Sequence, residues 1–107
     1  MTTKTIPEPK DRFDLPTNYR NLEWQERRAV REQYAEEQNN ECFWCGSDLN
    51  GEVDVDLLDI PVDWSLFPSG EEFLKYPVHL QHDHSTNMTE GAVHSLCNAI
   101  MWNYFRR

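Results

Sequence analysis

Two short stretches decide the fold, Cys42-Phe-Trp-Cys45-Gly46 and His94-Ser-Leu-Cys97. Each stretch carries two metal-ligating side chains three residues apart, and together they use all three cysteines of the chain. A structural zinc ion is held in a tetrahedron by four soft or borderline ligands, often supplied as two such pairs. Gly46 suits the tight turn that follows the first pair. We therefore predict one structural zinc ion, bound by Cys42, Cys45, His94 and Cys97.

An alternative interpretation treats these cysteines as small buried hydrophobic residues, because free cysteine is often buried. Cys97 falls on an apolar stripe and fits this alternative, whereas Cys42 and Cys45 lie in a polar turn and do not. The fourth zinc ligand is also open at this point. His94 has three competitors earlier in the chain, His79, His82 and His84.

Length and composition predict one small domain with a thin core. The chain has 107 residues, 38% of them apolar, and domains of this size usually gain from a disulfide or a metal. An odd number of cysteines argues against a closed disulfide framework, and no signal segment opens the chain. No run approaches the roughly 18 apolar residues of a membrane span. We expect a cytoplasmic protein without membrane contact, in a reducing compartment where clustered cysteines more often bind metal.

The net charge of −9 is concentrated in the middle of the chain. Residues 41–76 carry nine acidic side chains and one basic one, a net charge of −8. A nucleic-acid binder is usually basic on its binding face, because phosphate neutralisation dominates affinity, and the sequence reveals no such face. Arg27, Arg28 and Arg31 alternate with glutamates, which predicts a solvated, salt-bridged helix face.

The periodicity predicts an α+β fold. Residues 1–16 read as a flexible N-terminal arm, and residues 17–107 as one zinc domain. A helix is expected from Asn21 to Gln38, with Thr17 or Asn18 as its cap and Asn39-Asn40 as its stop.

The second half of the chain predicts short strands, turns and a helix. Strands are expected at Val53–Asp56, from alternation, and at Val78–His84, and a helical turn at Glu71–Lys75. Ser85–Glu90 reads as a polar turn. From Gly91 onward, apolar residues in steps of three and four predict an amphipathic helix that carries both His94 and Cys97 on one face.

Three of the four histidines lie in His79-Leu-Gln81-His82-Asp83-His84, next to the predicted zinc site. With Cys42-Phe-Trp-Cys45 and Gly91-Ala-Val-His94-Ser-Leu-Cys97-Asn98, this run resembles the recombination endonuclease VII branch of the HNH, or ββα-metal, nucleases of bacteriophages. The resemblance covers roughly residues 22–45 and 78–102. It implies a ββα-metal fold, and a location in the host cell cytoplasm if the chain is phage-encoded.

The resemblance also implies a mechanism of phosphodiester hydrolysis. His82 would be the general base that activates water. A divalent ion, commonly magnesium, would lie between position 81 and Asn98 and stabilise the leaving oxygen. The zinc would be structural and would clamp the hairpin to the following helix.

The chain departs from the family pattern at three places. Gln81 stands where the family has a metal-binding aspartate, although magnesium sites usually include a carboxylate. Asp83 is expected to share a strand face with Gln81 and to supply the missing carboxylate, or Asp83 and His84 form the working pair in a register shifted by two. His94 replaces a zinc cysteine, and residues 46–77 form a long acidic insertion.

Three functions stay open from the sequence alone. The first is an HNH-type metal-dependent endonuclease acting on DNA, with His82, Asp83, His84 and Asn98 as its site. The second is an inactive HNH-fold zinc protein whose acidic insertion binds a basic or DNA-binding host protein, or imitates DNA. The third is a zinc-stabilised fold with no further site.

Overall fold

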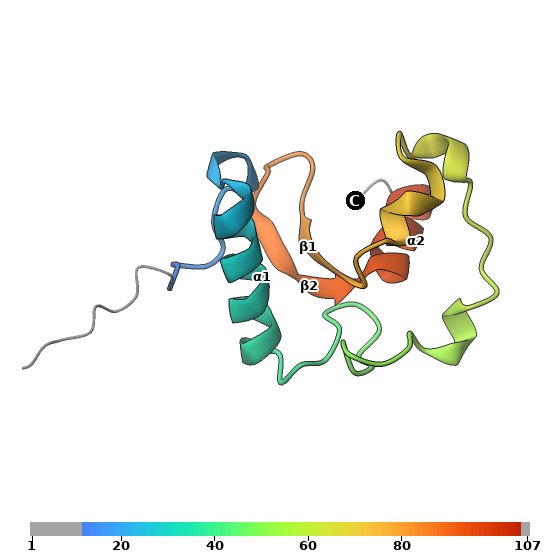
Figure 1. Cartoon of the computed structure of the whole chain (residues 1–107), viewed down its shortest axis with the longest axis horizontal. Coiled ribbons are helices and arrows are strands. Elements are labelled where there is room, and N and C mark those ends of the chain that lie inside the picture. Colours follow the sequence, from blue (N-terminus) through green and yellow to red (C-terminus); the bar gives the residue numbers. More distant parts are fainter. Residues whose placement is uncertain (1–11, 106–107) are drawn as a thin grey trace, which may run out of the picture.

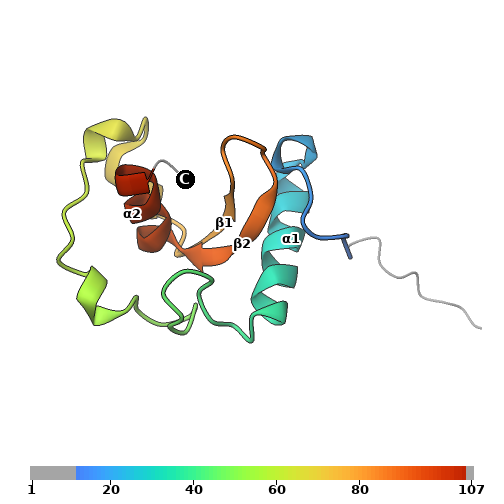
Figure 2. The same ribbon diagram turned by 180° about the vertical axis from the view of Figure 1, so that it is seen from behind.

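The computed structural model describes residues 12–105. Its main elements are α1 (Trp24–Glu37), β1 (Val78–His82), β2 (Thr89–His94) and α2 (Ser95–Phe105). The two helices flank the β1–β2 hairpin at opposite ends of the molecule (Figures 1 and 2). The predicted α+β class is therefore confirmed, with a hairpin that leads directly into a helix.

The hairpin is antiparallel, with Val78 opposite His94 and Gln81 opposite Gly91. The register shifts between Gln81 and His82. A preceding segment extends the hairpin at its open edge, because Thr17 and Thr89 exchange hydrogen bonds and the Tyr19 N–H donates to the Asn87 carbonyl at 2.7 Å. This pairing places Tyr19 beside the end of β1.

Helix α1 begins three residues later than predicted. Asn18 caps a short 3-10 turn, η1 (Tyr19–Asn21), by accepting a hydrogen bond from the Arg20 N–H. The α-helix itself starts after Glu23, whose N–H donates to the carboxylate of Glu26, as in a capping box. The predicted stop is confirmed, since Asn39 and Asn40 both have positive φ.

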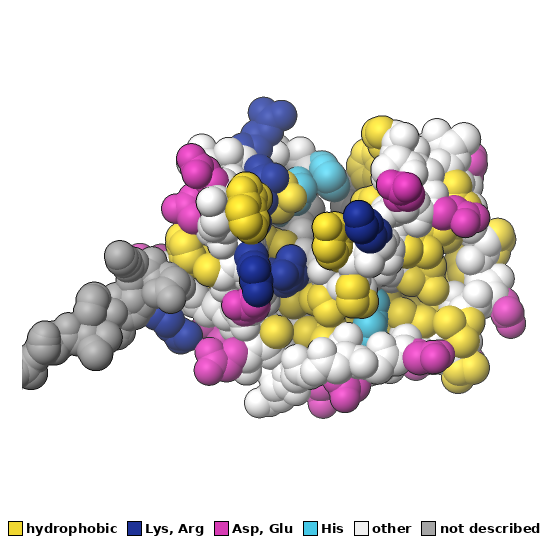
Figure 3. Space-filling model, in the orientation of Figure 1, with side chains coloured by type: hydrophobic (Ala, Val, Ile, Leu, Met, Phe, Trp, Pro, Cys, Tyr) yellow, Lys and Arg dark blue, Asp and Glu magenta, His cyan; other side chains and the backbone are white. Residues whose placement is uncertain are grey.

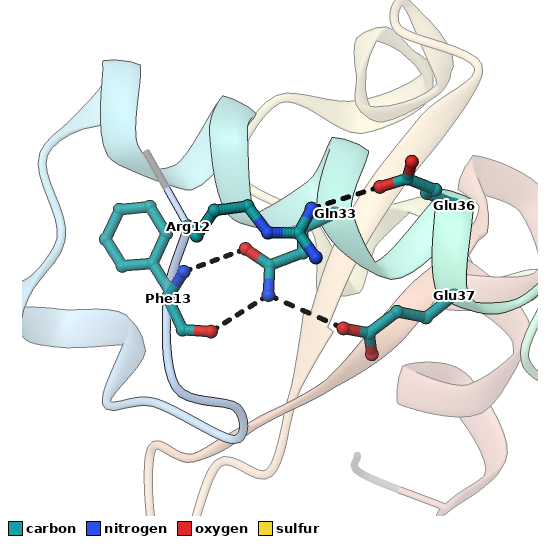
Figure 4. A network of polar contacts seen from close by, with 5 residues as sticks. All are labelled: Arg12, Phe13, Gln33, Glu36 and Glu37. Atoms are coloured by element: carbon teal, nitrogen blue, oxygen red, sulfur yellow. Dashed lines mark hydrogen bonds and ion pairs between the residues drawn. The ribbon is translucent and has the colours of Figure 1, made fainter. Parts of the chain in front are cut away.

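The predicted N-terminal arm lies largely outside the described residues. Of its last residues, Phe13 is tied to α1, because its backbone N–H and C=O both bond the side-chain amide of Gln33 (Figure 4). Arg12 pairs with Glu36 on the same helix at 3.1 Å. One face of α1 thus binds Arg12 and Phe13, and another face packs on the hairpin.

The core lies where α1, the hairpin and the start of α2 meet. Helix α1 contributes Val30 and Tyr34, and the Tyr34 hydroxyl bonds Thr89 of β2 at 2.8 Å. The remaining buried apolar side chains of this cluster come from the hairpin, from α2 and from flanking loops: Leu22, Cys42, Leu49, Leu80, Ala92, Val93, Cys97 and Met101.

The C-terminal helix starts at Ser95 and not at Gly91, which corrects the sequence prediction. Gly91 to His94 belong to β2 and pair with β1. Residues 89–94 are apolar enough to suit either a buried strand or a buried helix, and the partner strand decides between them. His94 is therefore the last strand residue, and Cys97 lies in the first turn of α2.

The acidic insertion, residues 46–77, contains three 3-10 turns: η2 (Val55–Leu57), η3 (Trp64–Leu66) and η4 (Gly70–Leu74). The predicted strand at Val53–Asp56 is wrong. Asp54 caps η2 by accepting from the Asp56 N–H, and the two-stranded sheet of the described residues offers this segment no partner. The predicted turn at Glu71–Lys75 is confirmed by η4. No described helix is both long and apolar enough to cross a membrane.

Candidate functional site

The four predicted zinc ligands meet at one point. The ligand atoms of Cys42, Cys45, His94 and Cys97 all lie within 4.8 Å of one another. His94 Nδ1 is 3.5 Å from the Cys45 sulfur and 3.7 Å from the Cys97 sulfur. Among the described residues no other histidine belongs to this group, so His94 is the fourth candidate ligand and its competitors are not.

Local structure explains how the turn from Cys42 to Gly46 forms, which we call the cysteine knuckle. The Gly46 N–H donates to the Cys42 carbonyl at 2.9 Å, and Gly46 has φ +82°, where a side chain would be strained. The Cys42 sulfur accepts three backbone N–H groups, from Trp44, Cys45 and His94, at 3.4–3.5 Å. Such N–H···S contacts stabilise a thiolate and orient it toward a cation.

A contact with the backbone fixes the orientation of the His94 ring. His94 Nε2 lies 2.8 Å from the backbone carbonyl of Asp48, so the proton sits on Nε2 and the Nδ1 lone pair faces the three sulfurs. This is the arrangement that metal-ligating histidines usually show. Asp48 follows the knuckle, and the loop therefore supplies both ligands and support.

Proton placement among the thiols also suits a cation. A hydrogen bond from the Cys97 thiol, helped by the backbone N–H groups, lowers the pKa of Cys42 to about 4. The same hydrogen bond, together with burial, raises the pKa of Cys97. Both effects favour negative charge on the Cys42 sulfur, which a bound cation would neutralise. Three sulfurs and one imidazole nitrogen at this spacing fit a tetrahedral zinc site.

A separate cavity of about 600 Å³ is lined by residues of α1, β1, α2 and the insertion. One wall comes from α1, the floor from β1, and the opposite wall from α2 and the insertion. Basic side chains gather over α1 on the face that holds this cavity, next to histidines, while most acidic side chains lie toward the rim (Figure 3). Its polar lining residues are Arg27, Arg31, His79, Gln81, His82, His84 and Asn98.

His82 is held by stacking. Its ring lies on the ring of Tyr19, with centroids 3.9 Å apart and 12° between planes. Arg27 covers the Tyr19 ring at 3.8 Å and donates to the Tyr19 carbonyl. His84 lies 4.4 Å from His82, centroid to centroid, and 4.9 Å from Trp102. Burial, with added repulsion from His84 and Arg27, lowers the pKa of His82 to about 4, so the ring is a neutral acceptor at pH 7.

Asn98 contacts a different histidine from the expected one. Its side-chain nitrogen lies 3.0 Å from Nδ1 of His79, and Phe73 packs edge-on against the same ring. Burial, helped by the charge of Arg31, lowers the pKa of His79 to about 4. Asn98 and His82 line the same cavity, so the structure brings them together without direct contact.

The expected carboxylate rescue by Asp83 is not what the structure shows. Strand β1 ends at His82, and the Asp83 carboxylate accepts from the Ser85 N–H and hydroxyl at 2.8 and 2.7 Å. Gln81 is buried, and its amide nitrogen donates to the His82 carbonyl and to Glu90. The register shift after Gln81 breaks the alternation that would have put positions 81 and 83 on one face.

The helix arginines divide into two groups, which corrects the predicted salt-bridged face. Arg28 pairs with Glu32 at 3.3 Å and is exposed. Arg27 and Arg31 are half-buried, line the cavity, and have no carboxylate partner among the described residues. The spacing of four residues between Arg27 and Arg31 could have predicted that they lie together, because residues four apart share a helix face. Tyr19 and Trp102 carried no local signal, since their roles depend on tertiary packing.

Fold and site together define a small α+β protein with a Cys₃His cluster beside a cavity lined by histidine and arginine. Protein-family models, curated proteins and solved structures give no match to this chain. What the protein does is therefore inferred from its own residues.

Proposed function

We propose that the chain is an HNH-type endonuclease that hydrolyses DNA phosphodiester bonds, with His82 as the general base. The supporting observation is that one cavity is lined by the imidazole of His82, by Asn98 and by two arginines that form no ion pair with a carboxylate among the described residues. An imidazole that is neutral at pH 7 can take a proton from water. Guanidinium groups bind phosphate and offset the negative charge that develops on it.

The chemistry that these residues support is a single displacement at phosphorus. His82 takes a proton from a water molecule, and the water oxygen attacks the phosphorus. The bond from phosphorus to the leaving oxygen breaks, and that oxygen takes a proton from solvent. Arg27 and Arg31 hold the phosphate while charge builds on its oxygens. Stacking on Tyr19 keeps the His82 ring in one orientation, so its nitrogen is already positioned when the substrate arrives.

The predicted magnesium ion does not fit this cavity well. Magnesium sites normally contain one or two carboxylates, and no aspartate or glutamate is among the described residues that line the cavity. Only the amide oxygens of Gln81 and Asn98 remain as hard donors. We therefore derive no step through magnesium. Imidazoles suit transition ions better than magnesium, so the metal dependence of cleavage is measured with both kinds of ion.

A nicking assay on supercoiled plasmid and on branched DNA tests the proposed nuclease. The reactions contain Mg²⁺, Mn²⁺, Ni²⁺ or Zn²⁺, and wild type is compared with His82→Ala and with a mock purification. Arg28→Gln is the matched control, because Arg28 lies on α1 outside the cavity. We expect nicking by wild type and Arg28→Gln and at least a hundredfold loss in His82→Ala, the scale of general-base catalysis. Absence of nicking with every ion overturns the proposal.

A second candidate is a non-catalytic module that binds a basic partner protein. The observation that favours it is the insertion, where Val55 and Leu58 are exposed at 71% and 49% between aspartates. Apolar side chains framed by one sign of charge suit a protein interface. This candidate predicts that the protein lacks nicking activity and that Val55→Ser with Leu58→Ser abolishes capture of a basic partner.

We also propose that the Cys₃His cluster binds zinc as a structural clamp. The cluster joins the knuckle after α1, the end of β2 and the start of α2, so one ion fastens three parts of the chain. Elemental analysis is expected to find about one zinc per chain, and chelation to unfold the protein cooperatively. A zinc-free protein with an unchanged melting temperature would contradict this role.

A further inference from the structure

The cavity has two chemically different walls. Arg27 and Arg31 on α1 form a basic wall. His82 lies on that side, because its ring stacks on Tyr19 and Arg27 covers the Tyr19 ring. The opposite wall is apolar and aromatic and comes from the insertion and α2. It consists of Leu66, Phe67, Phe73, Tyr76 and Trp102. A ligand that fills both sides carries an anion at one end and a flat apolar body at the other.

Size and exposure agree with such a ligand. The volume of about 600 Å³ lies within the range of roughly 300–1,000 Å³ that small-molecule sites occupy. Tyr76 is 66% exposed at the mouth of the cavity, so its ring offers a face for stacking. Phe73, in contrast, already packs against Phe67 and His79 and forms the fixed back of the wall.

The surroundings of the cavity disfavour binding of a DNA duplex. Bases in a duplex hide their faces in the stack, and reaching a pocket requires flipping the nucleotide out. Residues Glu71 and Glu72 are exposed on η4 beside the apolar wall. A second strand would bring its phosphates within a Debye length, about 8–10 Å, of these carboxylates. An unpaired strand avoids both penalties, because its bases are free to stack.

We infer that the cavity binds one nucleotide of an unpaired DNA strand, with the phosphate against Arg27 and Arg31 and the base against the aromatic wall at Tyr76. This inference rests on the proposed nuclease function and names its substrate as single-stranded DNA. It also explains how an acidic protein can bind a polyanion, since contact is confined to one basic wall.

Fluorescence anisotropy tests the preference directly. The probes are a short labelled oligothymidylate and the same strand paired with its complement, added to zinc-loaded full-length protein without other divalent ions. We expect the single strand to bind at least about tenfold more tightly than the duplex, because stacking on an aromatic ring is available only to unpaired bases. Equal or tighter binding of the duplex, or binding of neither probe, overturns the inference.

Two matched pairs of variants locate the site. Arg31→Gln is compared with Arg28→Gln, and Tyr76→Ala with Trp24→Ala, where Trp24 is 69% exposed outside the cavity. Arg31→Gln and Tyr76→Ala are each expected to weaken single-strand binding about fivefold or more, and the two controls are expected to leave it unchanged. Equal effects within each pair would place binding elsewhere and overturn the inference.

Measurements of DNA binding and of DNA cleavage distinguish the proposed nuclease from the proposed single-strand binding site. Single-strand binding through Arg31 and Tyr76 without any nicking removes the nuclease and leaves the binding site standing. Nicking of duplex DNA that depends on His82 but not on Tyr76 removes the single-strand preference and leaves the nuclease standing.

Discussion

At position 81 the chain has a neutral amide, where the nuclease family that its sequence resembles has a metal-binding carboxylate. Gln81 is 2% exposed, and its amide nitrogen donates to Glu90 at 3.2 Å and to the His82 carbonyl at 3.0 Å. Gln81 is therefore a hydrogen-bond donor that holds a carboxylate in place. An acidic side chain here would face Glu90 with like charge.

Gln81→Asp is expected to destabilise the protein without divalent ions and to be stabilised by added Mg²⁺. Without divalent ions, Gln81→Asp is expected to lower stability relative to Gln81→Asn by about 1–3 kcal/mol, because it brings a second carboxylate beside Glu90 and removes a donor. Added Mg²⁺ is expected to raise the melting temperature and the nicking activity of Gln81→Asp only. Thermal melts with and without Mg²⁺ measure this, and equal behaviour of the two variants would show that the missing carboxylate is not what limits metal binding.

His79 makes stability depend on pH. Its pKa is about 4 in the folded protein because of burial, against about 6.5 in the unfolded chain. Between these values the unfolded chain binds a proton that the folded protein does not, so the stabilisation present above pH 6.5 is lost as pH falls toward 4. The contribution is of order 1 kcal/mol after allowance for partial exposure.

Urea unfolding at pH 7 and pH 5 measures this dependence. His79→Gln is expected to lose less stability than wild type between the two pH values, because glutamine does not titrate. Proton competition for the thiolates weakens zinc binding at low pH in both proteins, so the comparison is between their pH slopes. Identical slopes would mean that His79 is not the titrating group.

The four residues of the candidate metal site could be predicted from the sequence, because their types and their spacing in two pairs are typical of zinc ligands. The structure was needed to exclude the other three histidines as the fourth member. The contact of Asn98 with His79 could not be predicted, since it depends on how α2 packs against β1, which no residue pattern marks. The role of Asp83 could not be predicted from the sequence either. Its side chain caps the turn through Ser85, and an aspartate that caps a turn and one that binds metal look alike in sequence.

At the scale of elements, α1 and β2 are joined through the side chain of Gln38. Its amide nitrogen donates to the Ala92 carbonyl and its oxygen accepts from the Ala92 N–H, both at 2.9 Å. The Phe43 N–H adds a third contact to Ala92 at 2.9 Å. Gly91 leaves space for this junction, because a Cβ there would lie 2.8 Å from both the Gln38 side-chain oxygen and Phe43 Cγ.

Filling that space is expected to loosen α1 from β2. Gly91→Ala is predicted to destabilise the protein by about 1–3 kcal/mol through overpacking, which corresponds to a drop in melting temperature of roughly 4 °C or more. Gly51→Ala is the matched control, since its Cβ would meet nothing closer than 3.6 Å. A melting temperature for Gly91→Ala equal to that of the control would show that Phe43 moves aside without cost.

The same junction explains why element boundaries were harder to predict than element types. Gly91 to His94 fit a helical pattern and a strand pattern equally, and only β1 and the Gln38 clamp select the strand. Val53–Asp56 alternates as a strand does, but without a partner strand its Asp54 caps the 3-10 turn η2 instead. The order of a strand, a turn and a helix was predictable, but the second strand, Thr89–His94, was predicted as the end of the turn and the start of the helix.

For the molecule as a whole, uneven charge decides how it can meet a polyanion. The chain carries −9 overall, with most of the excess in residues 41–76, while the cavity presents Arg27 and Arg31. Each phosphate neutralised on a single strand contributes about −0.7 to the slope of log affinity against log salt concentration. The one phosphate held by both arginines therefore predicts a slope of about −0.7.

Anisotropy titrations of labelled oligothymidylate at several salt concentrations measure this slope. Arg31→Gln is expected to bring the slope closer to zero, because one of the two cations that neutralise the phosphate is lost. Arg28→Gln is expected to leave the slope unchanged, because Arg28 is paired with Glu32 on the outer face. A slope steeper than about −3 would require more cationic contacts than the cavity offers. Binding would then involve another face of the protein, and neither the basic wall nor its neighbouring histidine would be where the strand is held.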